Sequence, residues 1–172
     1  MLKRGFTLVE LLIVIALLGA LAIGLIGALD PLEQIKKGTD TGTRDTTTQM
    51  HEAILRYYAV KGYMPWCTAP ATCNPFPGTS PNFTAANLST APMVAAVTAM
   101  VTAGELKSTF ASMKSGDLTK VYVFGDATTS DVTVCYHPTS KSFKADDNTK
   151  YDPQGVVDAD CATTDVCYWC IK

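Results

Sequence analysis

The hydropathy pattern begins with an uninterrupted apolar run near the start of the chain. No charged residue occurs in the nineteen positions from Leu11 to Leu29. At about 1.5 Å of rise per residue, a helix of that length extends over roughly 28 Å, which approaches the hydrocarbon thickness of a bilayer, about 30 Å. Lys3 and Arg4 precede the run, and flanking positive charges stay on the cytoplasmic side. The pattern therefore predicts a helix that crosses a membrane with its N-terminus inside.

The polar segment that follows predicts a second, amphipathic helix. Asp30-Pro31-Leu32-Glu33 combines a capping Asp, a Pro in the first turn and a Glu three residues after the cap, which is typical of a helix start. Apolar side chains then follow the spacing of one helix face: Met50, Ala53, Ile54, Tyr57 and Tyr58. We expect this helix over 31–61, with Gly62 as its C-cap and a break or kink near Pro31 because proline lacks a backbone N–H.

Beyond this helix, short β-like runs and turns predict a small antiparallel sheet. Residues 62–90 are expected to form a surface loop and residues 92–103 a shorter helix. Four runs are expected as strands: 121–123, 131–136, 142–145 and 166–171. His51 and His137 are expected at the surface. The sum is an α+β fold in which a long N-terminal helix packs on the sheet.

Charge and cysteine content narrow the class of protein. The net charge of −2 and the charged fraction of 17% give no basic surface that would indicate nucleic acid. All six cysteines lie beyond the apolar run: Cys67, Cys73, Cys135, Cys161, Cys167 and Cys170. An even number of cysteines suggests disulfides, and hence an oxidising compartment outside the cytoplasm. The bulk of the chain is therefore expected to be exported.

The C-x-x-C spacing of Cys167 and Cys170 leaves redox catalysis, zinc binding and structural disulfides as alternatives. A catalytic dithiol usually opens a helix, where the thiol pKa is lowered, whereas this pair lies in a β-prone segment. A zinc site would need paired clusters of Cys or His, which the spacing of the six cysteines does not give. We expect structural disulfides.

One acidic side chain, Glu10, separates three interpretations of the apolar run. The first interpretation is a cleaved secretory signal, for which Ala20-Leu21-Ala22 is an A-x-A match, and the second is a plain membrane anchor. Neither has a use for an ionised group in hydrocarbon, which costs at least about 2.5–3.5 kcal/mol. The third interpretation is an anchor that also assembles with other helices, which can give that charge a partner. Small residues that allow close helix packing recur every four positions: Ala16, Ala20, Gly24 and Ala28. The charge of Glu10 and this stripe of small residues together favour assembly of the helix with other helices.

The segment Lys3-Arg4-Gly5-Phe6-Thr7-Leu8-Val9-Glu10 with its apolar run resembles the class III signal of type IV pilins and the related pseudopilins of type II secretion. The shared features are a short basic leader ending in Gly5, then Phe6, then Glu10 at the fifth place after the Gly. The resemblance implies that a membrane-embedded prepilin peptidase cuts between Gly5 and Phe6 and methylates the new amino terminus. It also implies that Glu10 pairs with the amine of Phe6 in a neighbouring subunit.

The resemblance implies a division of the chain into four parts. These are a leader peptide over 1–5, a transmembrane and filament-core helix over 6–29, an amphipathic helix over 30–62 and an extracellular α+β domain over 63–172 with a disulfide-bearing C-terminal region. The type IV pilin-like fold implies a single-pass protein of the cytoplasmic membrane. The inner-membrane pilus assembly machinery then transfers it into an extracellular homo-oligomeric filament.

Three functions are compatible with these features. The first is a pilin of a filament for adhesion, motility or DNA uptake, and its alternative is a pseudopilin of a type II secretion or competence machine. The third is a membrane-anchored extracellular binding domain that does not polymerise. An enzyme is not expected, because no nucleophile and base stand together in a motif.

The pairing of six cysteines cannot be derived from spacing, since fifteen connectivities exist. The family commonly encloses a C-terminal loop with a disulfide. We accordingly prefer Cys67 with Cys73, and Cys135 with one of Cys161, Cys167 or Cys170.

An acidic cluster is a weak candidate for calcium binding. Some pseudopilins bind Ca²⁺ in their C-terminal loop, and oxygen ligands of the kind Ca²⁺ prefers gather here: Asp146, Asp147, Asn148 and Asp152. Their spacing does not match a twelve-residue calcium loop, so a solvated loop without a cofactor is preferred.

Overall fold

The computed structural model describes residues 5–28, 30–67, 86–89, 93–125, 131–152, 155–162 and 166–172. The chain forms two compact units, residues 1–35 and residues 36–172. The four-part division implied by the resemblance stays a prediction.

The first unit contains helix α1 (Leu8–Ala28) and the start of helix α2 (Pro31–Lys61). By length and composition, Leu8–Gly27 could cross a membrane, and its side chains are exposed. Asp30 caps α2, since its carboxylate oxygen Oδ1 accepts a hydrogen bond from the backbone N–H of Glu33 at 3.3 Å. The predicted helix start at Pro31 is confirmed, and α1 and α2 are separate helices.

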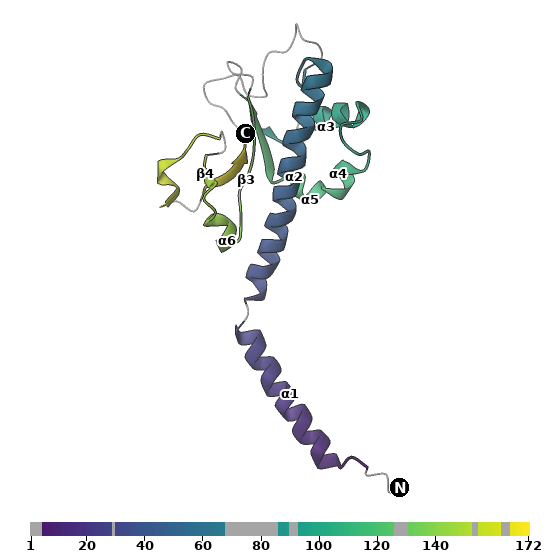
Figure 1. Ribbon diagram of the computed structural model, residues 1–172, viewed down its shortest axis with the longest axis vertical. Coiled ribbons are helices and arrows are strands. Elements are labelled where there is room, and N and C mark those ends of the chain that lie inside the picture. Colours follow the sequence, from purple (N-terminus) through teal and green to yellow (C-terminus); the bar gives the residue numbers. More distant parts are fainter. Residues whose placement is uncertain are drawn as a thin grey trace. The chain divides into compact units, whose positions relative to one another are not determined.

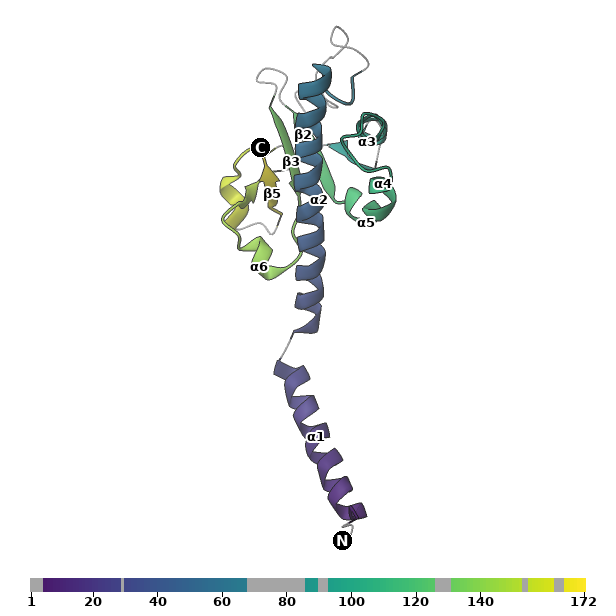
Figure 2. The same cartoon turned by 45° about the vertical axis from the view of Figure 1, so that its right-hand side comes forward.

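The second unit packs α2 against a five-stranded antiparallel sheet (Figures 1 and 2). The strands are β1 (Ala86–Asn87), β2 (Val121–Gly125), β3 (Val132–Tyr136), β4 (Thr149–Tyr151) and β5 (Tyr168–Ile171), in the spatial order β1-β2-β3-β5-β4. The shorter helices are α3 (Met93–Thr102), α4 (Phe110–Met113), α5 (Ser115–Leu118), α6 (Lys141–Lys144) and the 3₁₀ helix η2 (Ala159–Ala162). Both views show α3, α4 and α5 on one side of α2 and α6 on the other. The predicted α+β fold is confirmed.

The apolar face of α2 and the central strands form one core. Met50, Ala53 and Ile54 are at most 1% exposed and belong to the same buried cluster as Val123 and Val134. The predicted helix over 31–61 and the strands over 121–123, 131–136 and 166–171 are confirmed within one or two residues at their ends. Tyr58, assigned to the apolar face, is exposed, so that face ends one residue earlier.

Nearer its N-terminus, α2 is buried through polar rather than apolar contacts. The hydroxyls of Thr43 and Thr46 donate to the two carboxylate oxygens of Asp117, at 3.0 and 3.2 Å. The Thr46 hydroxyl also lies within hydrogen-bond distance of the Gly42 carbonyl of its own helix, at 2.9 Å. Buried polar groups are tolerated when they are hydrogen-bonded, so this threonine-rich half of the helix can pack closely against α5.

The predicted strand over 142–145 is wrong, because the chain forms helix α6 there. The buried carboxylate of Asp40 accepts hydrogen bonds from the backbone N–H groups of Thr139 and Ser140 at 2.7–3.1 Å. The N–H of Lys144 then donates to the Ser140 carbonyl at 3.0 Å, closing a helical turn. A contact with α2, about a hundred residues away along the chain, therefore sets the local conformation.

Other differences concern the sheet edges and one histidine. The edge strands β1 and β4 form where loops were expected. The expected surface position of His51 is wrong, because this residue shares the buried face of α2 with Thr47 and Ile54. His137 is half-buried, with its ring 5.4 Å from that of Tyr168.

Candidate assembly and processing site

The predicted processing site lies in a short non-helical segment before α1. Residues 5–7 precede the helix, and the Phe6 side chain is 80% exposed. Exposed irregular segments are the preferred sites of proteolytic cleavage, so the peptide bond between Gly5 and Phe6 is placed where a peptidase can reach it. Cleavage and methylation there stay predictions.

Glu10 lies in the first turn of α1, where its carboxylate binds Thr7. Its Oε2 accepts hydrogen bonds from the Thr7 backbone N–H at 2.9 Å and from the Thr7 hydroxyl at 2.8 Å. The Glu10 backbone N–H in turn donates to Thr7 Oγ1 at 3.2 Å. This is a capping box, in which an N-cap Thr and a Glu three residues later satisfy free backbone donors. The sequence interpretation missed Thr7, although Thr-x-x-Glu is the signal for such a box.

The surface of α1 contains small residues that no contact within the described chain explains. The predicted packing stripe runs along the helix: Ala16, Ala20, Gly24 and Ala28. A Cβ added at Gly19, Gly24 or Gly27 would meet nothing within 4 Å. Glycine inside a helix costs about 0.5–1 kcal/mol relative to alanine, and the described part of this chain offers no packing in exchange.

The C-terminal region contains two disulfides: Cys135–Cys170 and Cys161–Cys167. The first joins β3 to β5 at residues that are partners in the sheet register, and it is one of the three pairings left open for Cys135. Each sulfur of the C-x-x-C sequence is therefore bonded to a different cysteine, so the two do not form a redox dithiol with each other. Cys67 is also disulfide-bonded, but its preferred partner, Cys73, lies outside the described residues.

Three of the four candidate calcium ligands are hydrogen-bonded within the fold: Asp146, Asn148 and Asp152. Asp146 forms an ion pair with Arg44 at 2.9 Å and accepts a hydrogen bond from the backbone of Asn148. The Asp152 carboxylate accepts a hydrogen bond from the backbone N–H of Val156 at 2.8 Å. Asp147 is exposed. Within the described ranges, no group of three or more His, Cys, Asp or Glu side chains is placed to hold a metal ion. Calcium binding stays a prediction.

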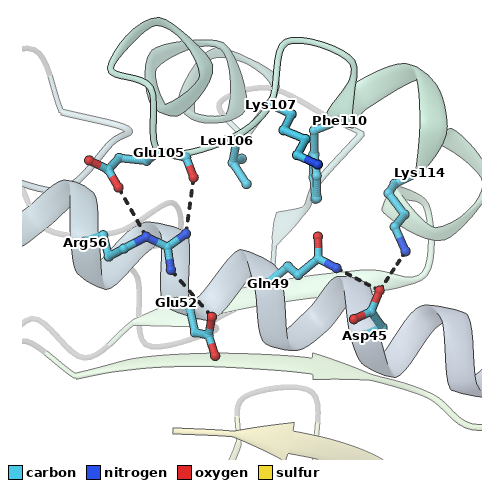
Figure 3. A pocket seen from close by; sticks show the side chains of 9 residues that line it. All are labelled: Asp45, Gln49, Glu52, Arg56, Glu105, Leu106, Lys107, Phe110 and Lys114. Carbon is cyan, nitrogen blue, oxygen red and sulfur yellow. Dashed lines mark hydrogen bonds and ion pairs between the residues drawn. The ribbon is translucent and has the colours of Figure 1, made fainter.

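A charged groove of about 430 Å³ lies between α2 and residues 105–114 (Figure 3). At one end, Arg56 donates from Nε to Glu105 Oε2 and from Nη2 to the Glu105 carbonyl, both at 3.2 Å. At the other end, Lys114 Nζ donates to Asp45 Oδ2 at 2.9 Å. The hydrogen bond from Lys114, with a second from Gln49, lowers the pKa of the Asp45 carboxyl. The two contacts tie the segment to α2 at both ends.

Between these ion pairs, the groove has an apolar floor made by the buried side chains of Leu106 and Phe110. Its described lining includes no serine, threonine, cysteine or histidine. Paired charges over buried apolar side chains hold this segment against α2.

Comparison with known proteins identifies the N-terminal segment. Residues 1–26 match the family model of the prokaryotic N-terminal methylation motif. No curated protein and no solved structure matches the chain. The matched segment contains Gly5, Phe6, Thr7 and Glu10, and most of α1. Residues 1–26 therefore form the class III signal of a type IV pilin-like prepilin, the signal that pilins and pseudopilins share.

Proposed function

We propose that the processed chain is a structural subunit that polymerises into a type IV pilus or a pilus-like filament. The observation that carries this proposal is the methylation motif continuing into an apolar helix whose side chains are exposed along its length. Such a surface must be covered by lipid or by protein. Lipid covers it while the subunit waits in the cytoplasmic membrane, and the helices of other copies cover it in the filament.

The charge at Glu10 gives the assembly its register. Cleavage after Gly5 leaves Phe6 with a free amine, whose reference pKa near 8 makes it largely cationic at neutral pH. Within the filament, Glu10 pairs with the amine of a neighbouring subunit, which offsets part of the desolvation of both charges. A slipped neighbour would leave both groups unpaired.

The capping box adds a function for Thr7 before assembly. In the single chain the Glu10 carboxylate already has two donors, the backbone N–H and the hydroxyl of Thr7. An acid near the apolar core is therefore hydrogen-bonded before any neighbour arrives, which lowers the cost of holding it there. The carboxylate is also kept at the N-terminal end of α1, where the new amine forms.

The decisive test replaces Glu10 and follows processing and assembly separately. The Glu10→Val chain should be cut before Phe6 and held in the membrane, yet give no sheared filaments. The control is Glu52→Val, which removes an exposed glutamate of α2 and should assemble normally. Mass spectrometry of the mature N-terminus and electron microscopy of sheared material measure the two steps. A wild-type chain that begins at another residue, or that forms no filaments, would overturn the proposal, and normal filaments from Glu10→Val would overturn the pairing role of Glu10.

A pseudopilin of a secretion or competence machine would share the signal and the helix. The two are separated by abundance, because a pilin dominates sheared filament preparations and a pseudopilin forms short, scarce assemblies. A membrane-anchored binding domain would be processed but found in no polymer. The exported domain with its disulfides favours the exposed pilin.

A further inference from the structure

Helices α2 and α6 bring four lysines together near the N-terminal end of α2. The Asp40 carboxylate accepts hydrogen bonds from the backbone N–H groups of Thr139 and Ser140 at 2.7–3.1 Å. Two lysines lie one helical turn before Asp40, since side chains three and four positions apart are neighbours on a helix, and two lie in the turn that follows Ser140. Figures 1 and 2 both show α6 beside α2. We call this group the basic end: Lys36, Lys37, Lys141 and Lys144.

The lysines of the basic end are open to a partner outside the chain. Lys36 and Lys141 are exposed, and Lys37 and Lys144 are half-buried. Among the ion pairs of the described residues, none involves Lys36 or Lys37. A lysine side chain can lie along the protein and still extend its ammonium group into the surroundings. The charges of this end can therefore meet a surface beyond the protein.

Acidic side chains of the same region are largely used within the fold. Asp40 is buried among its hydrogen-bond donors, and Asp146 is paired with Arg44 at 2.9 Å. Asp147 is exposed and Glu33 is half-exposed, which leaves the four lysines in excess. The outward charge of the basic end is therefore positive, although the chain as a whole carries −2.

Chain length keeps the basic end close to the membrane that α1 enters. The candidate membrane span ends at Gly27, and Lys36 follows it by nine residues. Nine residues rise about 14 Å as a helix and extend at most about 32 Å when fully stretched. Between them, Leu32 and Ile35 are 70% and 66% exposed. Exposed apolar side chains beside lysines are typical of helices at the bilayer surface, so the headgroups lie within range of the basic end.

Anionic phospholipid headgroups have the chemistry that matches this end. Lysine binds phosphate as a compact point charge, and clusters of roughly four or more basic residues beside a membrane helix are attracted to anionic lipids. Two of the four lysines come from α6, about a hundred residues further along the chain than Asp40. The folded domain is therefore needed to present the whole cluster.

We propose that the basic end binds the headgroups of anionic phospholipids on the exported side of the membrane. The contact holds the exported domain against the bilayer while the subunit waits, and it is released when the subunit enters a filament. The proposal rests on the membrane-held stage of the proposed function. It involves no second copy of the chain and is separate from the pairing of Glu10.

Lysine reactivity in lipid nanodiscs tests this contact without altering the chain. The full chain, one copy per disc, undergoes reductive methylation in phosphatidylcholine discs with and without phosphatidylglycerol, and mass spectrometry gives the rate at each lysine. The reaction needs the uncharged amine, which an anionic surface makes scarcer. The four lysines should react about fivefold more slowly with phosphatidylglycerol. Lys61, about 38 Å further along α2, is the internal control, because such a separation far exceeds the screening length of about 8 Å.

Each other outcome counts against the contact in a different way. Equal rates in the two kinds of disc would overturn it. So would slowing confined to Lys36 and Lys37, because closeness of α2 to a charged surface would slow those two alone. Slowing by inorganic phosphate without phosphatidylglycerol would indicate a site for free anions, and slowing in sheared filaments only would indicate a protein partner. A chain that discs do not retain would contradict the membrane-held stage of the proposed function as well.

Charge reversal on α6 gives a second measurement. Lys141→Glu combined with Lys144→Glu should return the rates of Lys36 and Lys37 to within about twofold of those without phosphatidylglycerol. The matched control combines Lys61→Glu with Lys107→Glu, at two exposed lysines outside the basic end, and should leave both rates slowed. Protease resistance and intact disulfides confirm that each variant folds. The same rates in both double variants would contradict the part assigned to α6.

Discussion

At the residue scale, single polar side chains of α2 determine how the second unit is held together. The Asp40 carboxylate is buried, and it accepts hydrogen bonds from two backbone N–H groups and from the Thr139 hydroxyl. Burial raises the pKa of Asp40, but the hydrogen bonds from Ser140 and Thr139 outweigh it and leave the pKa below its usual value. A carboxyl with a depressed pKa in the folded state stabilises the fold above its unfolded pKa, about 3.9, and loses that contribution as the pH falls through the folded pKa.

Asp40→Asn should therefore cost about 2 kcal/mol of unfolding free energy at pH 7, the range for hydrogen bonds to a charged group. The amide keeps one oxygen acceptor but turns an NH₂ donor towards backbone N–H groups. Urea unfolding of the full chain in detergent measures the loss, with Asp147→Asn at an exposed site as control. The difference between the variants should shrink near pH 3. Equal losses for the two substitutions would show that the contact is not stabilising.

His51 gives the fold a pH dependence of its own. Burial lowers its pKa, and a hydrogen bond with the Val132 backbone and the charge of Glu52 raise it by less. Below the unfolded pKa of about 6.5, the unfolded chain binds more protons at this position than the folded chain. Stability is therefore complete above that pH and falls as the pH falls towards the folded pKa. The melting temperature should drop between pH 7.5 and pH 5.5, and His51→Gln should reduce the drop. Parallel curves for the two chains would contradict this assignment.

At the element scale, the two C-terminal disulfides constrain different lengths of chain. Cys135–Cys170 spans 35 residues and fastens β3 to β5, whereas Cys161–Cys167 spans 6. In the chain-entropy description these separations correspond to about 4 and about 2 kcal/mol. Replacing the first pair by serines should thus destabilise the chain more than replacing the second, in urea unfolding under matched conditions. An equal or reversed order would mean that closing these loops is not the main effect.

Helices and strands with strong local signals were predictable. The capping residues Asp30 and Glu33 and the apolar spacing of α2 define a helix without reference to the rest of the chain, and β2, β3 and β5 contain runs of β-prone residues. The segment 142–145 was assigned wrongly because the Asp40 contact, far away in sequence, determines its turn. The edge strands are two or three residues long, which is too short for a periodic pattern to be visible.

The candidate site also has features that could be predicted from the sequence and features that could not. The processing signal is contiguous along the chain, so its residues could be named from the amino-acid sequence alone. The partner of Cys135 could not be chosen, because it depends on the register that places Cys135 opposite Cys170.

At the scale of the whole molecule, the buried side chains belong to the second unit, and the long exposed apolar surface belongs to α1 in the first unit. All buried side chains of the described residues lie between Asp40 and Cys170, and those described for α1 are exposed. The described core of the second unit is therefore built without side chains of α1.

Removal of the apolar helix tests that separation. A chain beginning at Asp30, exported to an oxidising compartment, should form both C-terminal disulfides. It should melt within about 2 °C of the full chain in detergent, which is less than a loss of 1 kcal/mol produces in a domain of this size. It should remain in solution and add to no filament, because the segment from Phe6 to Leu29 is missing. Calorimetry and mapping of the disulfide-linked peptides measure the first two outcomes, and sedimentation measures the third. A markedly lower melting temperature would mean that α1 contributes to the fold as well as to assembly.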